Sequence, residues 1–218
     1  MLIIPMFGAA FSGSGGGAKL KVLCLHGYAQ NAEILRDRSG GFRKPLKKSR
    51  FECVYVDGPF GCTKDGEGIE NADADPFRRA WWRGSSAETT YVGWTESRVR
   101  LVEMWESQKF DGILGFSQGA GAAAMLCAEL RPQFGIFVSG FVPRDQQAAA
   151  ALLSGVEDVP TLHVFGEGDT LVEPERSRAL SECFADSTVI VHEGGHMLPS
   201  SGVVRRQVVD FLERVESR

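Results

Sequence analysis

The sequence predicts an α/β fold, in which an open, mostly parallel sheet of six strands carries helices on both faces. Short apolar runs alternate with longer amphipathic segments along most of the chain, as is typical of strands joined by helical crossovers. Such strands pair in parallel and are buried on both sides. At 218 residues, the chain has the length of one domain of this class.

The predicted strands are short and apolar, and each ends at a turn or a polar loop. In chain order they span residues 20–25, 51–56, 112–115, 134–139, 161–165 and 188–191. Because parallel strands end at the same edge of a sheet, we expect the loops that follow them to gather there.

Helical periodicity or composition marks the segments between these strands. We expect helices at about 32–48, 96–108, 145–153 and 174–183, in the run of small residues that follows Ser117 and extends to Cys127, and at the C-terminus, where Val204, Val208, Phe211 and Val215 share one face. Pro45 interrupts the first of these segments. Thr95 is the expected N-cap of the second.

Residues 1–18 are expected to form a flexible N-terminal extension in front of a single domain at 19–218. The first residues are apolar, but no Lys or Arg precedes them, as a signal peptide would require. No stretch has the length of a membrane span, so no integral membrane segment is expected.

The charge balance argues against a nucleic-acid partner. The chain has 24 Lys and Arg against 28 Asp and Glu, a net charge of −4. It therefore lacks the excess of basic residues that is typical of proteins that bind nucleic acid. Its five cysteines are scattered without a Cys-x-x-Cys pair, which favours reduced thiols and a cytoplasmic location over disulfides or zinc. No metal or cofactor is expected, and the oligomeric state stays open.

The segment from Gly112 to Met125 predicts a nucleophile elbow. A short buried strand leads into Gly115-Phe-Ser-Gln-Gly119, and small helix-forming residues follow. In such a turn the serine takes a strained backbone conformation above the sheet, and glycines flank it because a Cβ would collide with the strand or the helix. The helix begins with free N–H groups near the developing negative charge. Ser117 is therefore the candidate nucleophile.

An acid and a histidine follow Ser117 in the chain, each just beyond a predicted strand. Asp169 follows the fifth strand in a turn able to aim its carboxylate, and His196 follows the sixth strand after two glycines. Serine, acid and histidine in this order are expected for a catalytic triad on this architecture. Glu167 is the alternative acid, and His192 is the alternative histidine.

Two backbone N–H groups are expected to form an oxyanion hole. Gln118 supplies one, because it follows the nucleophile. Tyr28, in the loop after the first strand, is the chosen second donor, and Ala29 is its alternative.

Two further histidines are interpreted as structural. His163 lies in the middle of a predicted strand, where a hydrogen-bonded core histidine is the simplest interpretation. His26 precedes a glycine at the end of the first strand, where we expect a structural hydrogen-bonding role near the site and not a catalytic one.

A lid-like loop is predicted at about 59–94. It is too long to be a simple connection, and its second half concentrates aromatic residues. Large aromatic side chains can line an apolar acyl pocket, so we expect Trp81 or Trp82 to contact substrate. The alternative is that these rings attach the loop to the sheet.

Several motifs occur in collinear order between about residues 20 and 215. They are Leu-Cys-Leu-His26-Gly27-Tyr28-Ala-Gln30-Asn31, Arg-Ser-Gly-Gly-Phe-Arg43-Lys44, Val-Asp57-Gly58-Pro59, Trp81-Trp82, Gly115-Phe-Ser-Gln-Gly119 and Gly195-His196-Met-Leu-Pro199. Together they resemble the family serine hydrolases, a group with yeast and human members. The resemblance implies an α/β-hydrolase fold, triad positions for Ser117, Asp169 and His196, and hydrolysis of carboxylic esters.

We therefore expect a serine esterase that cleaves small-molecule acyl esters of short to medium chain length through an acyl-enzyme intermediate. A thioesterase that removes acyl groups from proteins or from CoA would use the same residues and is the alternative. A non-catalytic binding protein of the same fold is the second alternative, although such proteins usually lack a triad residue.

Overall fold

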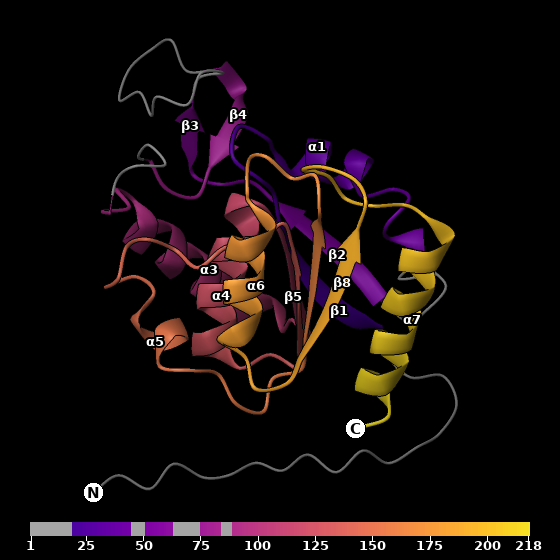
Figure 1. Cartoon of the computed structure of the whole chain (residues 1–218). Coiled ribbons are helices and arrows are strands. Elements are labelled where there is room, and N and C mark those ends of the chain that lie inside the picture. The colour runs from indigo at the N-terminus through magenta and orange to yellow at the C-terminus, as the bar shows by residue number, and fades with distance from the viewer. Residues whose placement is uncertain (1–18, 45–50, 63–74, 84–88) are drawn as a thin grey trace, which may run out of the picture.

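The computed structural model describes residues 19–44, 51–62, 75–83 and 89–218. Six strands form one sheet in the order β2-β1-β5-β6-β7-β8, and every neighbouring pair is parallel (Figure 1). The strands are β1 (Leu20–Leu25), β2 (Phe51–Val56), β5 (Gly112–Phe116), β6 (Phe134–Val138), β7 (Thr161–Gly166) and β8 (Ser187–His192). The predicted six-stranded sheet is confirmed.

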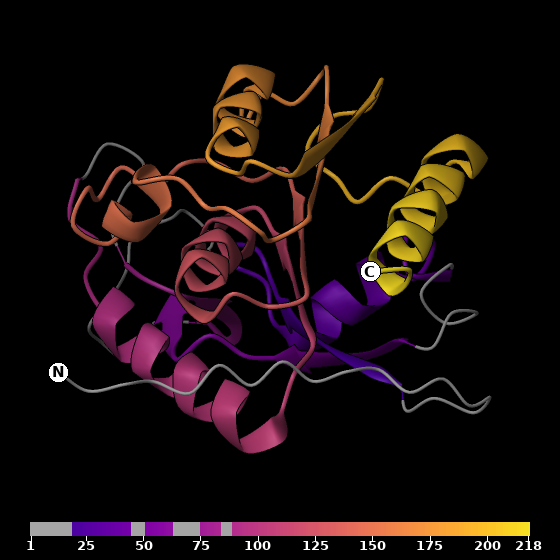
Figure 2. The same cartoon turned by 90° about the horizontal axis from the view of Figure 1, so that it is seen from below.

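Helices cover both faces of this sheet (Figure 2). They are α1 (Ala32–Arg38), α3 (Trp94–Gln108), α4 (Gln118–Leu130), α5 (Ala150–Leu153), α6 (Pro174–Glu182) and α7 (Gly202–Glu216). Two apolar cores result, one under α3 to α6 and the other under α1 and α7. Within the described ranges, no helix is long and apolar enough to cross a membrane.

Three predicted helix boundaries are wrong. The helix expected at 32–48 ends at Arg38 within the described residues, and Pro45 lies outside them. Instead of Thr95, the N-cap of α3 is Gly93, whose φ of 89° suits glycine. The helix expected from residue 145 begins only at Ala150; residues 146–149 form turns, in which the carboxylate and the carbonyl of Asp145 accept the N–H groups of Ala148 and Ala149.

The predicted lid-like loop contains a second, two-stranded sheet. Strands β3 (Phe60–Cys62) and β4 (Asp75–Ala80) pair antiparallel, although no strand was among those predicted for this loop. Residues 63–74 and 84–88 of this loop lie outside the described residues. A hydrogen bond of 2.7 Å from the Arg79 N–H to the Gln30 carbonyl joins β4 to the loop after β1.

The strand order places a crevice between β1 and β5. The chain moves outward from β1 to β2 on one side, and from β5 through β6 and β7 to β8 on the other. Loops that leave the carboxyl ends of β1 and β5 therefore diverge, and ligands of open α/β sheets bind at this kind of switch point.

Candidate active site

Ser117 lies at the carboxyl end of β5, where the chain turns into α4. Its φ of 54° and ψ of −119° are strained for a residue with a side chain. A Cβ on Gly115 would lie 2.2 Å from the Gly119 carbonyl oxygen, and one on Gly119 would lie 2.3 Å from the Leu25 carbonyl oxygen. At both positions another backbone segment lies so close that only glycine fits, as the sequence analysis expects.

Asp169 and His196 form a hydrogen-bonded pair beside the ends of β7 and β8. His196 Nδ1 lies 2.8 Å from Asp169 Oδ2, and the carboxylate side chain is fully buried. Asp169 Oδ1 accepts the N–H groups of Leu171 and Val172 at 3.0 and 2.9 Å. Because an ionised carboxylate only accepts, Nδ1 carries the imidazole proton and Nε2 is left as the acceptor.

The charge of Asp169 is stabilised despite its burial. Burial alone would raise the pKa of the carboxyl group, but the Val172 N–H and the His196 imidazole lower it, and the net shift is below the usual value. The group therefore stays ionised at neutral pH and can orient an imidazole.

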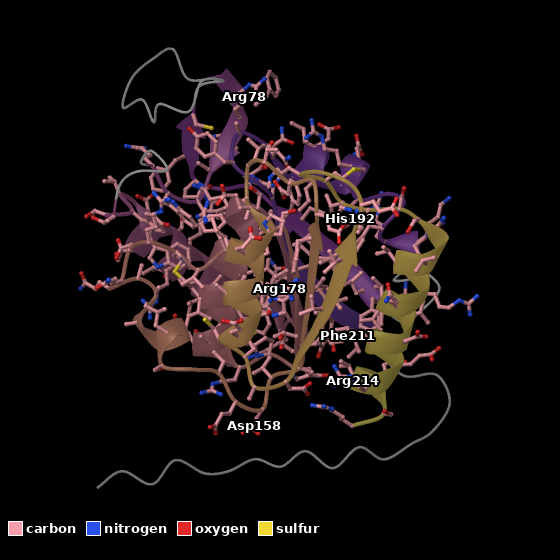
Figure 3. The ribbon with its side chains drawn as sticks, viewed as in Figure 1. Arg78, Asp158, Arg178, His192, Phe211 and Arg214 are labelled. Carbon is pink, nitrogen blue, oxygen red and sulfur yellow. The ribbon has the colours of Figure 1, made fainter. Side chains whose placement is uncertain are left out.

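The alternative acid and histidine lie differently. Glu167 is exposed. The His192 Nδ1 accepts the Gly194 N–H at 3.1 Å, and partial burial lowers the pKa of this imidazole. His192 ends β8 near the upper edge of the sheet in Figure 3. Of the two acids and two histidines, the structure pairs Asp169 with His196.

Backbone hydrogen bonds hold the acid loop against the histidine loop. Glu167 N–H donates to the His192 carbonyl at 2.8 Å, and Gly168 N–H donates to the Gly194 carbonyl at 3.1 Å. A Cβ on Gly166 would lie only 2.0 Å from the Gly194 carbonyl oxygen. Because glycines occur in both loops, the loops can touch, and their contact fixes the positions of Asp169 and His196.

The loop after β1 is fixed by a buried network around His26. The Gly58 N–H donates to His26 Nε2 at 2.9 Å, and Trp81 Nε1 donates to the His26 carbonyl at 2.8 Å. The Gln118 amide accepts the Trp81 N–H at 2.9 Å and donates to the Trp82 carbonyl at 3.1 Å. This network joins the loop after β1 to the start of α4, as the predicted structural role of His26 requires.

The candidate oxyanion donors both lie next to this network. Tyr28 and Gln118 both border the cavity that contains Ser117. Among the described residues, no backbone hydrogen bond outside the helices and strands uses either N–H group. Ala29, the alternative donor, also borders the cavity and has a φ of 55°.

A cavity of about 920 Å³ opens beside Ser117 and His196. This volume lies toward the upper end of the range for small-molecule sites. Trp82 lines the cavity and stacks on Tyr91 with ring centroids 4.4 Å apart. Trp81 is not among the lining residues; it is 1% exposed and packs against the His26 ring.

The sequence analysis missed part of the cavity wall. Phe141 and Arg144 follow β6, Leu171 follows Asp169, and Arg176 lies in the first turn of α6. Phe141, Arg144 and Leu171 lie in loops after strand ends, so the rule used for the triad could also have identified these three. Within the described residues, no three His, Cys, Asp or Glu side chains gather as metal ligands.

This fold and site define a class of protein, the α/β-hydrolases with a serine at the nucleophile elbow. A family described as serine hydrolase (FSH1) matches residues 16–208. Esterase OVCA2 of Danio rerio is 34% identical and the match covers 90% of this chain and 98% of the relative. Esterase AGAP003155 of Anopheles gambiae is 36% identical, with coverage of 90% and 78%.

Solved structures agree on the fold. Zea mays acyl-protein thioesterase 2 superposes with a TM-score of 0.64 at 15% identity, covering 94% of this chain and 96% of that one. Esterase PE8 superposes with a TM-score of 0.66 at 21% identity, covering 92% and 94%. The chain belongs to the FSH1 serine hydrolase family.

Proposed function

We propose that this serine hydrolase cleaves carboxylic acyl esters of short to medium chain length, with Ser117, His196 and Asp169 as its catalytic triad. The observation that carries the proposal is the hydrogen bond between His196 and the buried Asp169 beside a strained serine at the sheet's switch point. The relatives described as esterases support an ester as the substrate.

In the proposed mechanism, Ser117 Oγ attacks the ester carbonyl while His196 Nε2 takes its proton. Asp169 keeps the imidazole in the correct tautomer and stabilises the imidazolium. The N–H groups of Tyr28 and Gln118 bind the tetrahedral oxyanion. The protonated His196 then donates to the leaving alkoxide, and water hydrolyses the acyl-enzyme by the same steps in reverse.

The composition of the cavity wall supports chains of limited length. Arginines line the cavity together with Trp82 and other apolar side chains, so a long apolar chain would have to desolvate guanidinium groups. A thioester would use the same residues, and kinetics on matched butyryl ester and butyryl thioester substrates separate the two activities.

The test is covalent labelling with a fluorophosphonate probe. We expect the probe to label Ser117, and Ser117→Ala to abolish labelling while the melting temperature is kept. Ser139→Ala is the matched control, because Ser139 also follows a strand and has a positive φ of 47°. Labelling that persists in Ser117→Ala, or that disappears in Ser139→Ala, would remove Ser117 from the mechanism.

A further inference from the structure

A second cavity of about 500 Å³ adjoins the cavity beside Ser117. Its walls come from α3, α4 and α5 and from the loop after β6. These three helices lie on the same face of the sheet (Figures 1 and 2). Of the described residues, Tyr91 alone lines both cavities. Tyr91 therefore lies where the two cavities meet.

Three aromatic rings in mutual contact lie between the cavities. Trp82 lines only the cavity beside Ser117, and Trp94 lines only the second cavity. The Tyr91 ring stacks on Trp82 with centroids 4.4 Å apart and planes 7° apart, and Trp94 meets Trp82 edge-on at 5.8 Å. Because rings stacked at this separation are in van der Waals contact, an acyl chain cannot pass between Tyr91 and Trp82.

Hydrogen bonds fix Tyr91 at its backbone and at the tip of its side chain. Its N–H donates to Asp145 Oδ2 at 2.9 Å, and its hydroxyl accepts the Arg144 N–H at 2.8 Å. The carbonyl of the next residue, Val92, accepts the Arg83 N–H at 2.8 Å, which ties this segment to the chain that follows β4. Because backbone, ring and hydroxyl are all held, the ring forms a fixed wall.

The ring wall begins one helical turn from the nucleophile. A Cβ placed on Gly121 would lie 3.5 Å from Trp82 Cη2 and 3.6 Å from Phe141 Cε2. The N–H of Gly121 donates to the Ser117 carbonyl at 3.2 Å in the first turn of α4. Two apolar side chains therefore meet over this turn, and an acyl chain that leaves Ser117 along them reaches Tyr91.

The chemistry of the second cavity suits an apolar chain. Arg98 pairs with Glu129 at 2.7 Å, and both carboxylate oxygens of Asp145 accept backbone N–H groups. Trp94, Met125 and several alanines supply apolar surface. Once the ring wall is opened, an acyl chain can therefore bury methylene groups in this cavity without leaving a charge unpaired.

We propose that Tyr91 determines the longest acyl chain that this enzyme accepts. Its ring ends the acyl pocket, and the second cavity behind the ring stays out of reach of the substrate. The inference rests on the proposed ester hydrolysis and names a specificity-determining residue for it. The aromatic ring forms the wall, whereas the hydroxyl only helps to hold the ring in place.

The first measurement compares kcat/KM for the 4-nitrophenyl esters of butanoate, octanoate and dodecanoate. Tyr91→Ala should raise the ratio of dodecanoate to butanoate by at least about tenfold, because each methylene that becomes buried in the second cavity contributes nearly fourfold. Tyr91→Phe keeps the stacked ring and should keep the wild-type ratio. An unchanged ratio in Tyr91→Ala, or an equal rise in Tyr91→Phe, would contradict the proposal.

Tyr55→Ala is the matched control. Tyr55 is also partly buried, and its hydroxyl pairs with Ser39 Oγ at 3.0 Å, but it lies on β2 and lines neither cavity. This variant should lower the melting temperature and leave the ratio of dodecanoate to butanoate unchanged. If it raised the ratio as much as Tyr91→Ala does, the effect would come from a general loosening of the fold, and Tyr91 would not be the wall.

Binding without turnover separates this proposal from the proposed function. In Ser117→Ala, calorimetric titration with 2-pentanone, 2-octanone and 2-dodecanone, whose ketone mimics the ester carbonyl, measures affinity against chain length. The affinity should stop rising before 2-dodecanone in this variant and should continue to rise when Tyr91→Ala is added. That result supports the proposal even if no ester is hydrolysed. Identical length profiles in the single and double variants would overturn it, even if the wild type hydrolyses esters.

Discussion

At the scale of single residues, the environment of one carboxylate decides its role. Asp169 has a fully buried side chain, while Glu167, two positions earlier, is exposed. Backbone N–H groups occupy one oxygen of Asp169, which leaves the other to hold His196. A carboxylate exposed to solvent, such as that of Glu167, would hold the imidazole in a single tautomer less firmly.

Asp169→Asn should therefore lower kcat by up to about 10⁴-fold, because the imidazole loses the acceptor that fixes its tautomer. Glu167→Gln is the matched control and should change kcat by less than about twofold, since surface substitutions away from a site have small effects. Steady-state kinetics on one ester, with melting temperatures of both variants, make the comparison. A larger loss in Glu167→Gln would show that the acid has been assigned wrongly.

The sequence predicted this residue pair because position after a strand end is a strong constraint. It left Glu167 and His192 open, since several polar residues follow each strand and only the fold shows which of them meet. Arg176 was missed because nothing in the local pattern of α6 distinguishes it from Arg178, which lies on the same helix. Only the packing of Phe141 beneath its guanidinium separates the two.

At the scale of elements, the end of β4 carries two adjacent tryptophans with different surroundings. Trp81 is buried beneath the loop after β1, where its indole N–H holds the His26 carbonyl. Trp82 lines the cavity and packs between Tyr91 and Trp94, with ring centroids 4.4 and 5.8 Å away. Of the two adjacent rings, Trp82 therefore borders the cavity and Trp81 does not.

Trp82→Ala should move the preferred acyl length toward longer chains, because each further buried methylene contributes about 0.8 kcal/mol, or nearly fourfold in kcat/KM. Trp81→Ala is the comparison. It should lower the free energy of unfolding by about 3 to 5 kcal/mol and reduce activity on all esters alike. Length profiles and chemical denaturation of both variants provide the data.

An unchanged length profile in Trp82→Ala would show that the acyl chain binds along another wall of the cavity. A shifted profile in Trp81→Ala, with stability intact, would reverse the two roles. Sequence alone could not choose between these rings, because adjacent residues near the end of a strand face opposite directions and the register was unknown.

The elements that the sequence predicted best are those buried on both faces. Strands β5, β6 and β7 are buried along their whole length, and apart from Thr161 and His163 in β7 they occur as apolar runs. The pair β3 and β4 was missed because its first strand is very short and its second begins Asp-Pro, residues that disfavour a strand. The helix expected at 145–153 is longer than α5, because the turns after Asp145 have the side-chain and backbone hydrogen bonds of a first helical turn without continuing into a regular helix before Ala150.

At the scale of the whole molecule, the two apolar cores enclose neutral histidines. His26 and His163 are 0% and 1% exposed. Burial lowers the pKa of His26 to about 4 and that of His163 to about 3. His163 Nε2 pairs with Thr161 Oγ1 at 3.1 Å, and the ring packs between Phe137 and Phe184. Both imidazoles are therefore uncharged in the folded protein at neutral pH.

This burial predicts how stability depends on pH. The unfolded chain binds protons at these imidazoles near pH 6.5, whereas the folded chain binds them only near pH 4 and pH 3. The unfolded state therefore holds more protons throughout this window, and stability falls as pH falls from about 6.5. Each of the two groups should cost about 2 kcal/mol at pH 5 relative to pH 8.

Urea denaturation at pH 8, 7, 6 and 5 measures this slope, and His163→Gln identifies one source of it. Glutamine does not titrate and can still donate to the Thr161 hydroxyl, so the variant should lose about 2 kcal/mol less between pH 8 and pH 5 than the wild type. His192→Gln is the matched control, because His192 lies on the adjacent strand and is only partly buried. Because the pKa of His192 is also lowered, this variant should lose part of the pH dependence, but less of it than His163→Gln. If His163→Gln and the wild type lose the same free energy over this range, His163 is not held neutral by the core, and the pH dependence must come from other groups.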